Sequence, residues 1–351
     1  MNILRRVFKN RIGAVSLSVL GLLYLSVIFA PFLAPYKYDE DDVLRSYAPP
    51  TKIHFFDFEK KQFGPFIYGK TYEVNEYYQR IYTEDRTKIY PVKFFSKGFS
   101  YKLLGIWESD RHLFGVQGEK IYLFGADLKG RDIFSRILYG GRVSLSIVII
   151  AALISFSIGL LVGGMSGYFG GKVDNITMRM CEMIMMLPSF YLLLVLRSSF
   201  PMHWGSTQIY FMIVIILSLI GWASLARTIR GMSLSLRENE FVYAAKASGL
   251  SNFKIIVRHI LPHTLSYSLV ALVLSIPSYI LAEAALSLIG LGIQEPEASW
   301  GNLLSSALGI INIRLYPWIL IPGIFILVTG MCFYVLGDVL RDVLDPKRKI
   351  L

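Results

Sequence analysis

The sequence of 351 residues has little charge and almost no cysteine. Only 17% of its residues are charged and 54% are hydrophobic, whereas soluble globular chains carry about 25% charged residues. Charge-free runs cover residues 12–36, 143–171, 198–226 and 315–337. Each run is long enough to cross a bilayer core of about 30 Å, which takes about 20 helical residues. The scarcity of charge excludes a chain of soluble domains and predicts an integral membrane protein.

The two cysteines, Cys181 and Cys332, both lie inside apolar segments. No disulfide framework or cysteine-based zinc site is therefore available. A net charge of +11 would suit a nucleic-acid partner in a soluble protein, but basic residues in a membrane protein mostly mark its topology. No nucleic-acid partner is expected. The first apolar run is too long for a signal peptide and is interpreted as a retained anchor.

We predict an all-α membrane protein with six transmembrane helices, at residues 12–34, 142–166, 180–200, 209–226, 265–291 and 316–336. Lys and Arg are distributed unevenly between the two sides. Sixteen lie in the N-terminus, the loop 167–179, the loop 227–262 and the C-terminus, whereas only Arg197 and Arg314 lie in the short loops opposite. The positive-inside rule therefore predicts that both termini are cytoplasmic and that the lipid bilayer surrounds the spans.

The long first loop is expected to fold as a small extracytoplasmic insertion. It is nearly balanced in charge and rich in Phe and Tyr, and a segment that can bury so much aromatic surface is not expected to be disordered. We predict a mixed, β-containing insertion with short strands near residues 63–73 and 87–95. It packs on the outer ends of the spans or docks an extracytoplasmic partner, and the sequence does not choose between these roles. The expected domain boundaries are 1–35, 36–122, 123–340 and 341–351.

The loop 227–262 is typical of two short amphipathic helices. The first helix places Ala244, Ala245 and Ser248 on one small-residue face, and Gly249 can end it in the left-handed conformation. The second helix has an apolar stripe at spacing i, i+3, i+4, i+7, formed by Phe253, Ile256, Val257 and Ile260.

Pro262 is expected to stop this second helix. A break there separates His259 from His263 and argues against a metal site. The helical pair could lie on the lipid surface, pack under its own bundle, or enter a groove on a cytoplasmic protein. Periodicity alone leaves these three interpretations open.

Two stretches of this loop carry a family resemblance. Residues 243–249 read Tyr-Ala-Ala-Lys-Ala-Ser-Gly, and after nine residues 259–262 read His-Ile-Leu-Pro. The pattern resembles the EAA-loop signature of ABC importer permeases, in the form typical of the oligopeptide/dipeptide family. Tyr243 stands where many relatives carry Glu, which leaves open what replaces that contact. The resemblance implies that an ATPase-coupling site is formed by Ala244, Ala245, Gly249, Phe253, Ile256, Val257, His259, Ile260, Leu261 and Pro262.

Further segments agree with this family. They are Gly-Ala-Asp-Leu-Lys-Gly-Arg-Asp at 125–132, Gly-Tyr-Phe-Gly-Gly at 167–171, Leu-Pro-Ser at 187–189, Ala-Glu-Ala at 282–284, Ser-Trp-Gly-Asn at 299–302 and Leu-Asp-Pro at 344–346. The "GRD" segment before span two is similar to the C-type permease, and the long insertion is similar to peptide and microcin C-type relatives. The resemblance implies a type I ABC importer permease fold in a bacterial cytoplasmic membrane. It also implies a second homologous permease, two cytoplasmic ATPase subunits, an extracytoplasmic substrate-binding protein and a peptide substrate.

No nucleotide site is expected in this chain. The stretch nearest to a P-loop ends in Gly130-Arg131-Asp132 and lacks the phosphate-binding lysine. The chain is therefore expected to be a non-enzymatic subunit without cofactor or metal, driven by separate ATPases. Their closure would move the helical pair as a lever and tilt the spans that are attached through Arg230 and Pro262.

Two intramembrane residues are candidates for the translocation path or gate. Glu283 is an ionisable group at membrane depth, where such groups usually face a bundle interior or water. Pro188, with Pro277 and Pro322, could bend a span. The alternative for each is structural: a bond to a neighbouring helix for Glu283 and a packing kink for the prolines.

Other functions remain as alternatives. The same machinery could import a nickel chelate, a sugar or a peptide-like toxin. A proton-coupled secondary transporter would need its own coupling site, and an intramembrane protease would need a catalytic arrangement such as His-Glu-x-x-His, which does not occur.

Overall fold

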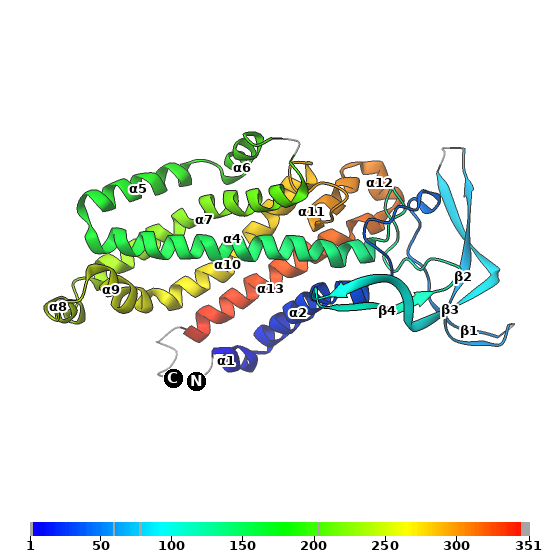
Figure 1. The fold of residues 1–351 in the computed structure, drawn as a ribbon, viewed down its shortest axis with the longest axis horizontal. Coiled ribbons are helices and arrows are strands. Elements are labelled where there is room, and N and C mark those ends of the chain that lie inside the picture. Colours follow the sequence, from blue (N-terminus) through cyan, green and yellow to red (C-terminus); the bar gives the residue numbers. More distant parts are fainter. Residues whose placement is uncertain (1–2, 59, 77–78, 202–203, 345–351) are drawn as a thin grey trace. The chain divides into compact units, whose positions relative to one another are not determined.

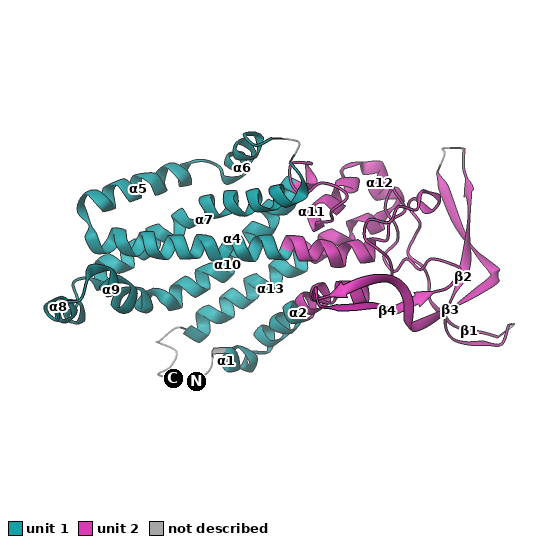
Figure 2. Ribbon diagram, in the orientation of Figure 1, with its two compact units in different colours: residues 1–21, 145–286, 327–351 teal, residues 22–144, 287–326 magenta. Residues whose placement is uncertain are grey.

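The computed structural model describes residues 3–58, 60–76, 79–201 and 204–344. These residues form two compact units (Figure 2). Unit 1 contains the described residues of 1–21, 145–286 and 327–351, and unit 2 contains those of 22–144 and 287–326. Most of the predicted tail 341–351, including Lys347, Arg348 and Lys349, lies outside the described residues.

Unit 1 is helical throughout (Figure 1). Its elements are α1 (Ile3–Lys9), α2 (Arg11–Ile28), α4 (Ile133–Phe169), α5 (Gly171–Met186), α6 (Ser189–Ser198), α7 (Ser206–Leu236), α8 (Glu240–Ala247), α9 (Asn252–Ile255), a π-helical turn (Ile256–Ile260), α10 (Leu261–Leu288) and α13 (Ile321–Leu344). Four of these helices continue into unit 2: α2, α4, α10 and α13. Helix α1 lies beside the end of α13 (Figure 1), where Arg6 Nη1 donates to the Val343 carbonyl at 3.4 Å.

The number of membrane spans agrees with the six that the sequence predicts. Among the described residues, five helices are long and apolar enough to cross a bilayer, and α5 with α6 forms a sixth candidate that is bent by 91°. The bend falls where Pro188 precedes α6, because proline disfavours the helical conformation of the residue before it. Leu187 is accordingly extended, with φ −82° and ψ 132°. The segment predicted as the third span is therefore two helices joined at a sharp bend.

The expectation that Pro262 stops a helix is wrong. Residues 252–288 run as one helical segment, with Pro262 in the first turn of α10. The preceding π turn is closed by a bond from the Leu261 amide to the Ile256 carbonyl. In an ideal α-helix a proline lacks the N–H to donate and its ring clashes with the carbonyl four residues back, but the wider π turn before Pro262 departs from that geometry and lets the helix continue. His259 and His263 therefore lie on one continuous helical segment.

Glycines of α4 let α4 and α7 approach closely. A Cβ atom at Gly163 would lie 2.5 Å from the carbonyl oxygen of Ala226, and one at Gly167 would lie 2.5 Å from that of Arg230. Small residues at such crossings allow backbone-to-backbone packing in membranes. The two helices form the frame on which α8 and α9 rest.

Unit 2 carries the insertion. Its strands β1 (His54–Asp57), β2 (Gln62–Val74), β3 (Arg80–Leu103) and β4 (Trp107–Val116) form an antiparallel sheet in the order β1-β2-β3-β4. The β-containing insertion is confirmed, but the strands are longer than predicted. β3 pairs with β2 up to Pro91 and with β4 from Val92 onward. Proline lacks a ladder donor, so it fits the point where the strand changes partner.

Short helices complete unit 2. They are α3 (Ala30–Leu33), α11 (Trp300–Leu303) and α12 (Ile310–Leu315), with 3₁₀ turns at Val43–Arg45, Leu304–Leu308 and Pro317–Leu320. Trp300 is buried and its indole N–H donates to the Ile137 carbonyl at 3.0 Å. Ser299 and Asn302 form a capping box at the start of α11.

Candidate functional site

The two helices of the loop 227–262 are joined by a fixed turn. The Gly249 amide donates to the Lys246 carbonyl at 3.0 Å, and the Leu250 amide donates to the Ala245 carbonyl at 3.2 Å. This pair of bonds is the Schellman motif, which needs a left-handed residue after the C-cap. Gly249 has φ +76°, as expected from the sequence. The angle between α8 and the helix that follows is therefore set by backbone bonds.

One face of this helical pair is buried in unit 1. Val242 and Ala245 of α8 pack with Ile255, Ile256 and Ile260 in one apolar cluster. The cluster includes Leu160 and Tyr168 of α4 and Ile229 of α7. Burying each isoleucine side chain stabilises the unit by about 1.5–3 kcal/mol. The pair is thus fastened to the frame formed by α4 and α7.

The opposite face is exposed and apolar. Phe253 is 61% exposed, Tyr243 is 51% exposed and Val257 is 42% exposed. The predicted stripe therefore divides: Ile256 and Ile260 are buried, whereas Phe253 and Val257 face outward. The π turn has more residues per turn than an α-helix, so ideal spacing did not predict this division. Ala244 and Pro262 are also exposed, His259 is half-buried and Leu261 is buried.

Sequence reasoning missed two buried residues of this site. Val242 and Ile255 are fully buried in the cluster, but neither belongs to the small-residue face or to the predicted stripe. The signal that could have found Val242 is its spacing of three from Ala245, which places both on one helical face. The position of Ile255 depends on the π turn that follows it.

Tyr243 has an acidic partner at the start of the helical pair. Its hydroxyl donates to the Glu238 carboxylate at 2.7 Å, and Arg237 Nε donates to the other oxygen at 2.7 Å. These two hydrogen bonds hold the pKa of Glu238 below its usual range. The bond to Glu238 raises the pKa of Tyr243. A carboxylate therefore lies next to the position where the family motif usually carries Glu.

An ion pair between Arg230 and the buried Asp174 anchors α7 next to this loop. Arg230 Nε donates to Asp174 Oδ1 at 2.8 Å, and its Nη2 pairs with Oδ2. Ser166 Oγ also donates to Asp174 Oδ1, at 2.7 Å. Asp174 is only 7% exposed, and a buried charge needs such partners to offset its desolvation. The ends of α4, α5 and α7 are held together at this point.

A cavity of about 600 Å³ lies beside the bend between α5 and α6. It is lined from α5, α6, α7 and α10, with hydroxyl groups from Ser189, Ser224 and Tyr279 among mostly apolar side chains. Pro188 immediately precedes α6 at the break. Glu283 is fully buried, and its neighbours Ala282 and Ala285 line the cavity while Glu283 itself does not.

A chain of hydroxyl groups runs from one lining residue of the cavity, Tyr279, to α4 and α7. Tyr279 Oη donates to Ser155 Oγ at 2.9 Å, and Ser155 Oγ donates to the Ser218 carbonyl at 3.1 Å. A Cβ atom at Gly221 would lie 1.6 Å from Tyr279 Oη. Glycine is required at this position because the phenol passes directly over its backbone.

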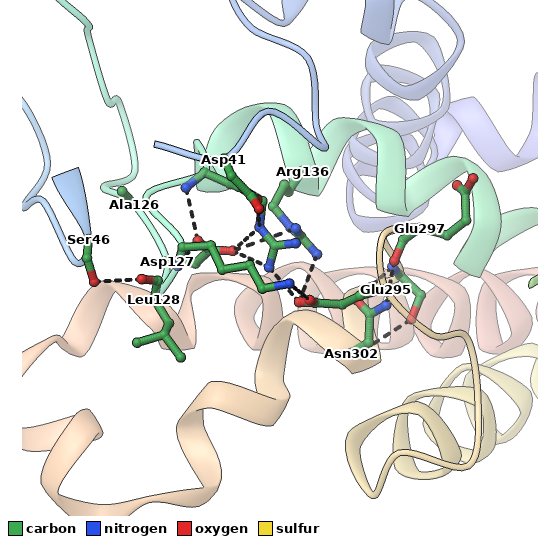
Figure 3. A network of polar contacts seen from close by, with 12 residues as sticks. Asp41, Ser46, Ala126, Asp127, Leu128, Arg136, Glu295, Glu297 and Asn302 are labelled. Carbon is green, nitrogen blue, oxygen red and sulfur yellow. Dashed lines mark hydrogen bonds and ion pairs between the residues drawn. The ribbon is translucent and has the colours of Figure 1, made fainter. Parts of the chain in front are cut away.

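A second polar network lies in unit 2, where the segment 125–132 meets the segment 295–302 (Figure 3). Arg131 Nε donates to Asp127 at 2.7 Å, and its Nη2 donates to Glu295 at 2.5 Å. Arg136 lies 3.6 Å from Asp127 and 3.9 Å from Glu295, and Lys129 pairs with Glu295 at 2.5 Å. Arg131 of the "GRD" segment is thus held within unit 2, and Glu295 is the common partner of Lys129, Arg131 and Arg136.

The network shifts two carboxyl groups in opposite directions. Burial raises the pKa of Asp132 to about 6, although two hydrogen bonds from Ser135 act to lower it. Partial burial would also raise the pKa of Glu295, but the bonds from Arg131 and Lys129 outweigh it and lower this pKa to about 2. Glu295 is therefore ionised at any physiological pH.

The family is decided by a match over most of the helical part of the chain. A family model described as "binding-protein-dependent transport system inner membrane component" matches residues 155–350, which is more than half of the sequence. The chain belongs to this family. A second model, described as the N-terminal TM domain of oligopeptide transport permease C, matches residues 2–50.

The relatives of this transport component are peptide permeases. The oligopeptide transport system permease protein OppC of Haemophilus influenzae is 43% identical over 65% of this chain and 71% of its own length. OppC of Bacillus subtilis is 30% identical over 97% of this chain and 87% of its own length. The dipeptide transport system permease protein DppC of Lactococcus lactis is 32% identical over 98% of this chain and 89% of its own length. The predicted resemblance to the oligopeptide/dipeptide family is confirmed.

In this membrane component, sequence reasoning found the helical pair and the break at Pro188, but the predicted loop 227–262 is shorter, because residues 227–236 belong to α7 and residues 252–262 to the helical segment 252–288. It did not find Glu295 or the cavity. Glu295 is 164 residues from Arg131 in the chain, and no local pattern indicates such a partner. The cavity is formed by four helices, and its lining residues have no common spacing in the sequence.

Proposed function

We propose that the chain is one of two membrane-spanning subunits of an ATP-driven peptide importer. It would form the translocation path with a second homologous permease, receive peptide from an extracytoplasmic binding protein, and couple to two cytoplasmic ATPase subunits. Both termini and the loop 227–262 would lie in the cytoplasm. The peptide specificity of the relatives and the excess of basic residues in these segments support this proposal.

The observation that carries the proposal is the two-sided helical pair. Its inner face is fixed in the cluster around Ile256 and Ile260, and its outer face exposes Tyr243, Phe253 and Val257. An apolar helical face with aromatic anchors is suited to a groove on a partner protein. In an importer of this family, that partner would be an ATPase subunit.

The pair formed by Tyr243 and Glu238 supplies a polar contact on the same face. Glu238 is exposed and its carboxylate is bonded by Tyr243 and Arg237. We infer that this carboxylate takes the part of the Glu that the motif lacks at residue 243. The acid then reaches the ATPase from the segment before α8 rather than from α8 itself.

The lever mechanism follows from how the pair is attached. Closure of the ATPases would displace α8, and the Schellman turn at Gly249 would carry the displacement to the helix that continues into α10. The Arg230–Asp174 pair would carry it to α7 and α5. These helices line the cavity, so the motion would alternate access to it.

The cavity would be this subunit's half of the path. None of its lining residues in the described chain is an Asp, Glu, Lys or Arg, so a peptide would meet apolar surface and hydroxyl groups. Such a surface accepts varied side chains without demanding a fixed charge. Pro188 would let α6 move relative to α5, and Glu283 would brace the helix behind the wall.

The test of ATPase docking uses Phe253→Ser in the complex co-expressed with its ATPases. Because Phe253 is largely exposed, the variant keeps its fold, and recovery of ATPase with the permease falls at least tenfold, about 1.4 kcal/mol. Phe58→Ser is the matched control, since Phe58 is 84% exposed in unit 2. Unchanged recovery with Phe253→Ser would exclude this face as the docking site.

The substrate class needs a separate measurement. The complete transporter in proteoliposomes is expected to accumulate a labelled oligopeptide when ATP and the binding protein are supplied. Accumulation of a nickel chelate or a sugar in its place would contradict the peptide assignment but would leave the ATP-coupled mechanism intact. Uptake that follows a proton gradient without ATP would contradict both.

A further inference from the structure

The turn between β3 and β4 has an unusual composition. Leu104 and Gly105 have φ values of +51° and +74°, and the Ile106 amide donates to the Leu103 carbonyl at 3.1 Å. These are features of a type I′ hairpin turn, in which Asn-Gly or Asp-Gly is the usual pair. A leucine in the left-handed conformation is disfavoured, so the local backbone does not explain its presence.

The side chains of this turn form an exposed apolar tip. Leu104 is 56% exposed, Ile106 is 74% exposed and Trp107 is 65% exposed. Behind the tip, Lys102 pairs with Glu108 at 3.0 Å and Lys97 lies 3.9 Å from Asp110. The end of the hairpin is therefore apolar, and charged pairs join the two strands behind it.

The hairpin lies against the end of the first membrane span. Both β3 and β4 contact α3, which follows α2 directly. The rings of Phe32 and Phe95 are 6.1 Å apart, and the Lys37 ammonium is 6.0 Å from the ring of Phe99. Figure 1 shows that the turn points back along the last part of α2 rather than toward the rest of the sheet. In this part of α2, Leu22 and Leu25 are exposed.

We propose that the tip formed by residues 104–107 enters the interfacial layer of the bilayer beside the first span. The exposed apolar surface of α2 is a lipid-facing surface, and the tip continues it. Tryptophan is enriched at the membrane–water interface. An apolar side chain at a type I′ turn is removed from water when it enters this layer, and the free energy of that transfer favours an apolar residue at the turn. The ion pair between Lys102 and Glu108 sets the depth, because charged groups resist entry into hydrocarbon.

The test is a depth measurement on the full chain in nanodiscs of phosphatidylethanolamine and phosphatidylglycerol. Ile106→Cys in a Cys181→Ala, Cys332→Ala background carries a nitroxide label, and its collisions with oxygen and with a water-soluble nickel chelate are compared. Phe56→Cys is the matched control, since Phe56 is an exposed apolar residue of β1. At residue 106 oxygen collisions are expected to exceed nickel collisions, and at residue 56 the reverse.

A second measurement needs no label. Brominated lipids are expected to quench the fluorescence of the unmodified chain more strongly than that of Trp107→Phe, because the lost indole is the one that contacts lipid from the hairpin. Equal nickel access at residues 106 and 56 would overturn the proposal. Protection of residue 106 from both reagents only when an extracytoplasmic protein is added would also overturn it, in favour of a protein contact.

Discussion

At the scale of single residues, Glu295 shows how one side chain can join distant segments. Its carboxylate accepts from Arg131 and Lys129 and lies near Arg136. Its pKa is about 2 in the folded chain, against an ordinary value of 4.5. The folded state therefore binds this proton less tightly than the unfolded state, and the carboxylate stabilises the fold above pH 4.5. This stabilisation is lost as the pH falls from 4.5 toward 2.

This dependence of stability on pH predicts how Glu295→Gln differs from the parent. The variant should be less stable than the parent at pH 6, and the difference should shrink as the pH falls to 3. Because the side chain is 44% exposed, screening limits the effect to about 1 kcal/mol. Thermal unfolding of the purified permease at each pH measures it. Asp132, whose raised pKa acts in the opposite direction, is present in both proteins and cancels in the comparison.

The control for this measurement is Glu73→Gln, which removes an exposed carboxylate from β2 of the same unit. It should change stability little at any pH. A difference between Glu295→Gln and the parent that stays constant from pH 6 to pH 3 would mean that the charge of Glu295 does not stabilise unit 2.

At the scale of elements, the turn between α8 and α9 gives the sharpest prediction. Gly249→Leu places a side chain at φ +76°, where a non-glycine residue costs about 1–2 kcal/mol. A Cβ atom there meets no neighbouring atom, so the expected damage is to the angle of the pair and not to its packing. The complex should assemble, and ATP hydrolysis should no longer drive uptake.

Gly231→Leu is the control for Gly249→Leu. It distinguishes the effect of distorting the turn at Gly249 from a general effect of replacing a glycine with leucine. Gly231 lies within α7 with open space around its Cβ position and no positive φ, so this variant should keep coupling. Measuring ATPase activity and peptide uptake in parallel distinguishes assembly from coupling. Normal coupling in Gly249→Leu would contradict the lever mechanism.

The elements also show what local patterns can and cannot predict. Charge-free runs located the spans because a bilayer core admits few charges, and Pro188 marked the break because its effect on Leu187 is local. The rule that a proline ends a helix failed at Pro262, where a π turn lets the helix continue. The burial of Ile255 in place of Phe253 has the same origin, since one wide turn shifts the phase of the stripe.

At the scale of the whole molecule, the distribution of basic residues predicts which side each segment faces. In the background without native cysteines, Phe56→Cys should react with a membrane-impermeant maleimide in intact cells. Lys254→Cys should react only after the cells are permeabilised, because its loop is expected in the cytoplasm. Residues 56 and 254 are both exposed in the structure, so burial does not account for a difference. Labelling of residue 254 in intact cells would reverse the topology.

The insertion marks where whole-molecule prediction from sequence ended. Its aromatic content predicted a folded segment with a short strand near residues 63–73, and the structure extends this strand to Gln62–Val74. The length of β3 and its change of partner depend on pairings between residues far apart in the chain. The contacts of Glu295 likewise join residues far apart in the chain. No short window of sequence contains such pairs.

The divided pairing of β3 has a consequence for how this insertion can evolve. Because residues 80–91 pair with β2 and residues 92–103 pair with β4, each half of the strand belongs to its own hairpin. Insertions or deletions near the end of the β2–β3 hairpin therefore leave the register of the β3–β4 hairpin intact. The β3–β4 hairpin would keep its contacts with α3, whereas Ile67 of β2 packs with Phe114 of β4 and must be retained. Length can therefore vary at one end of the insertion while its core is conserved.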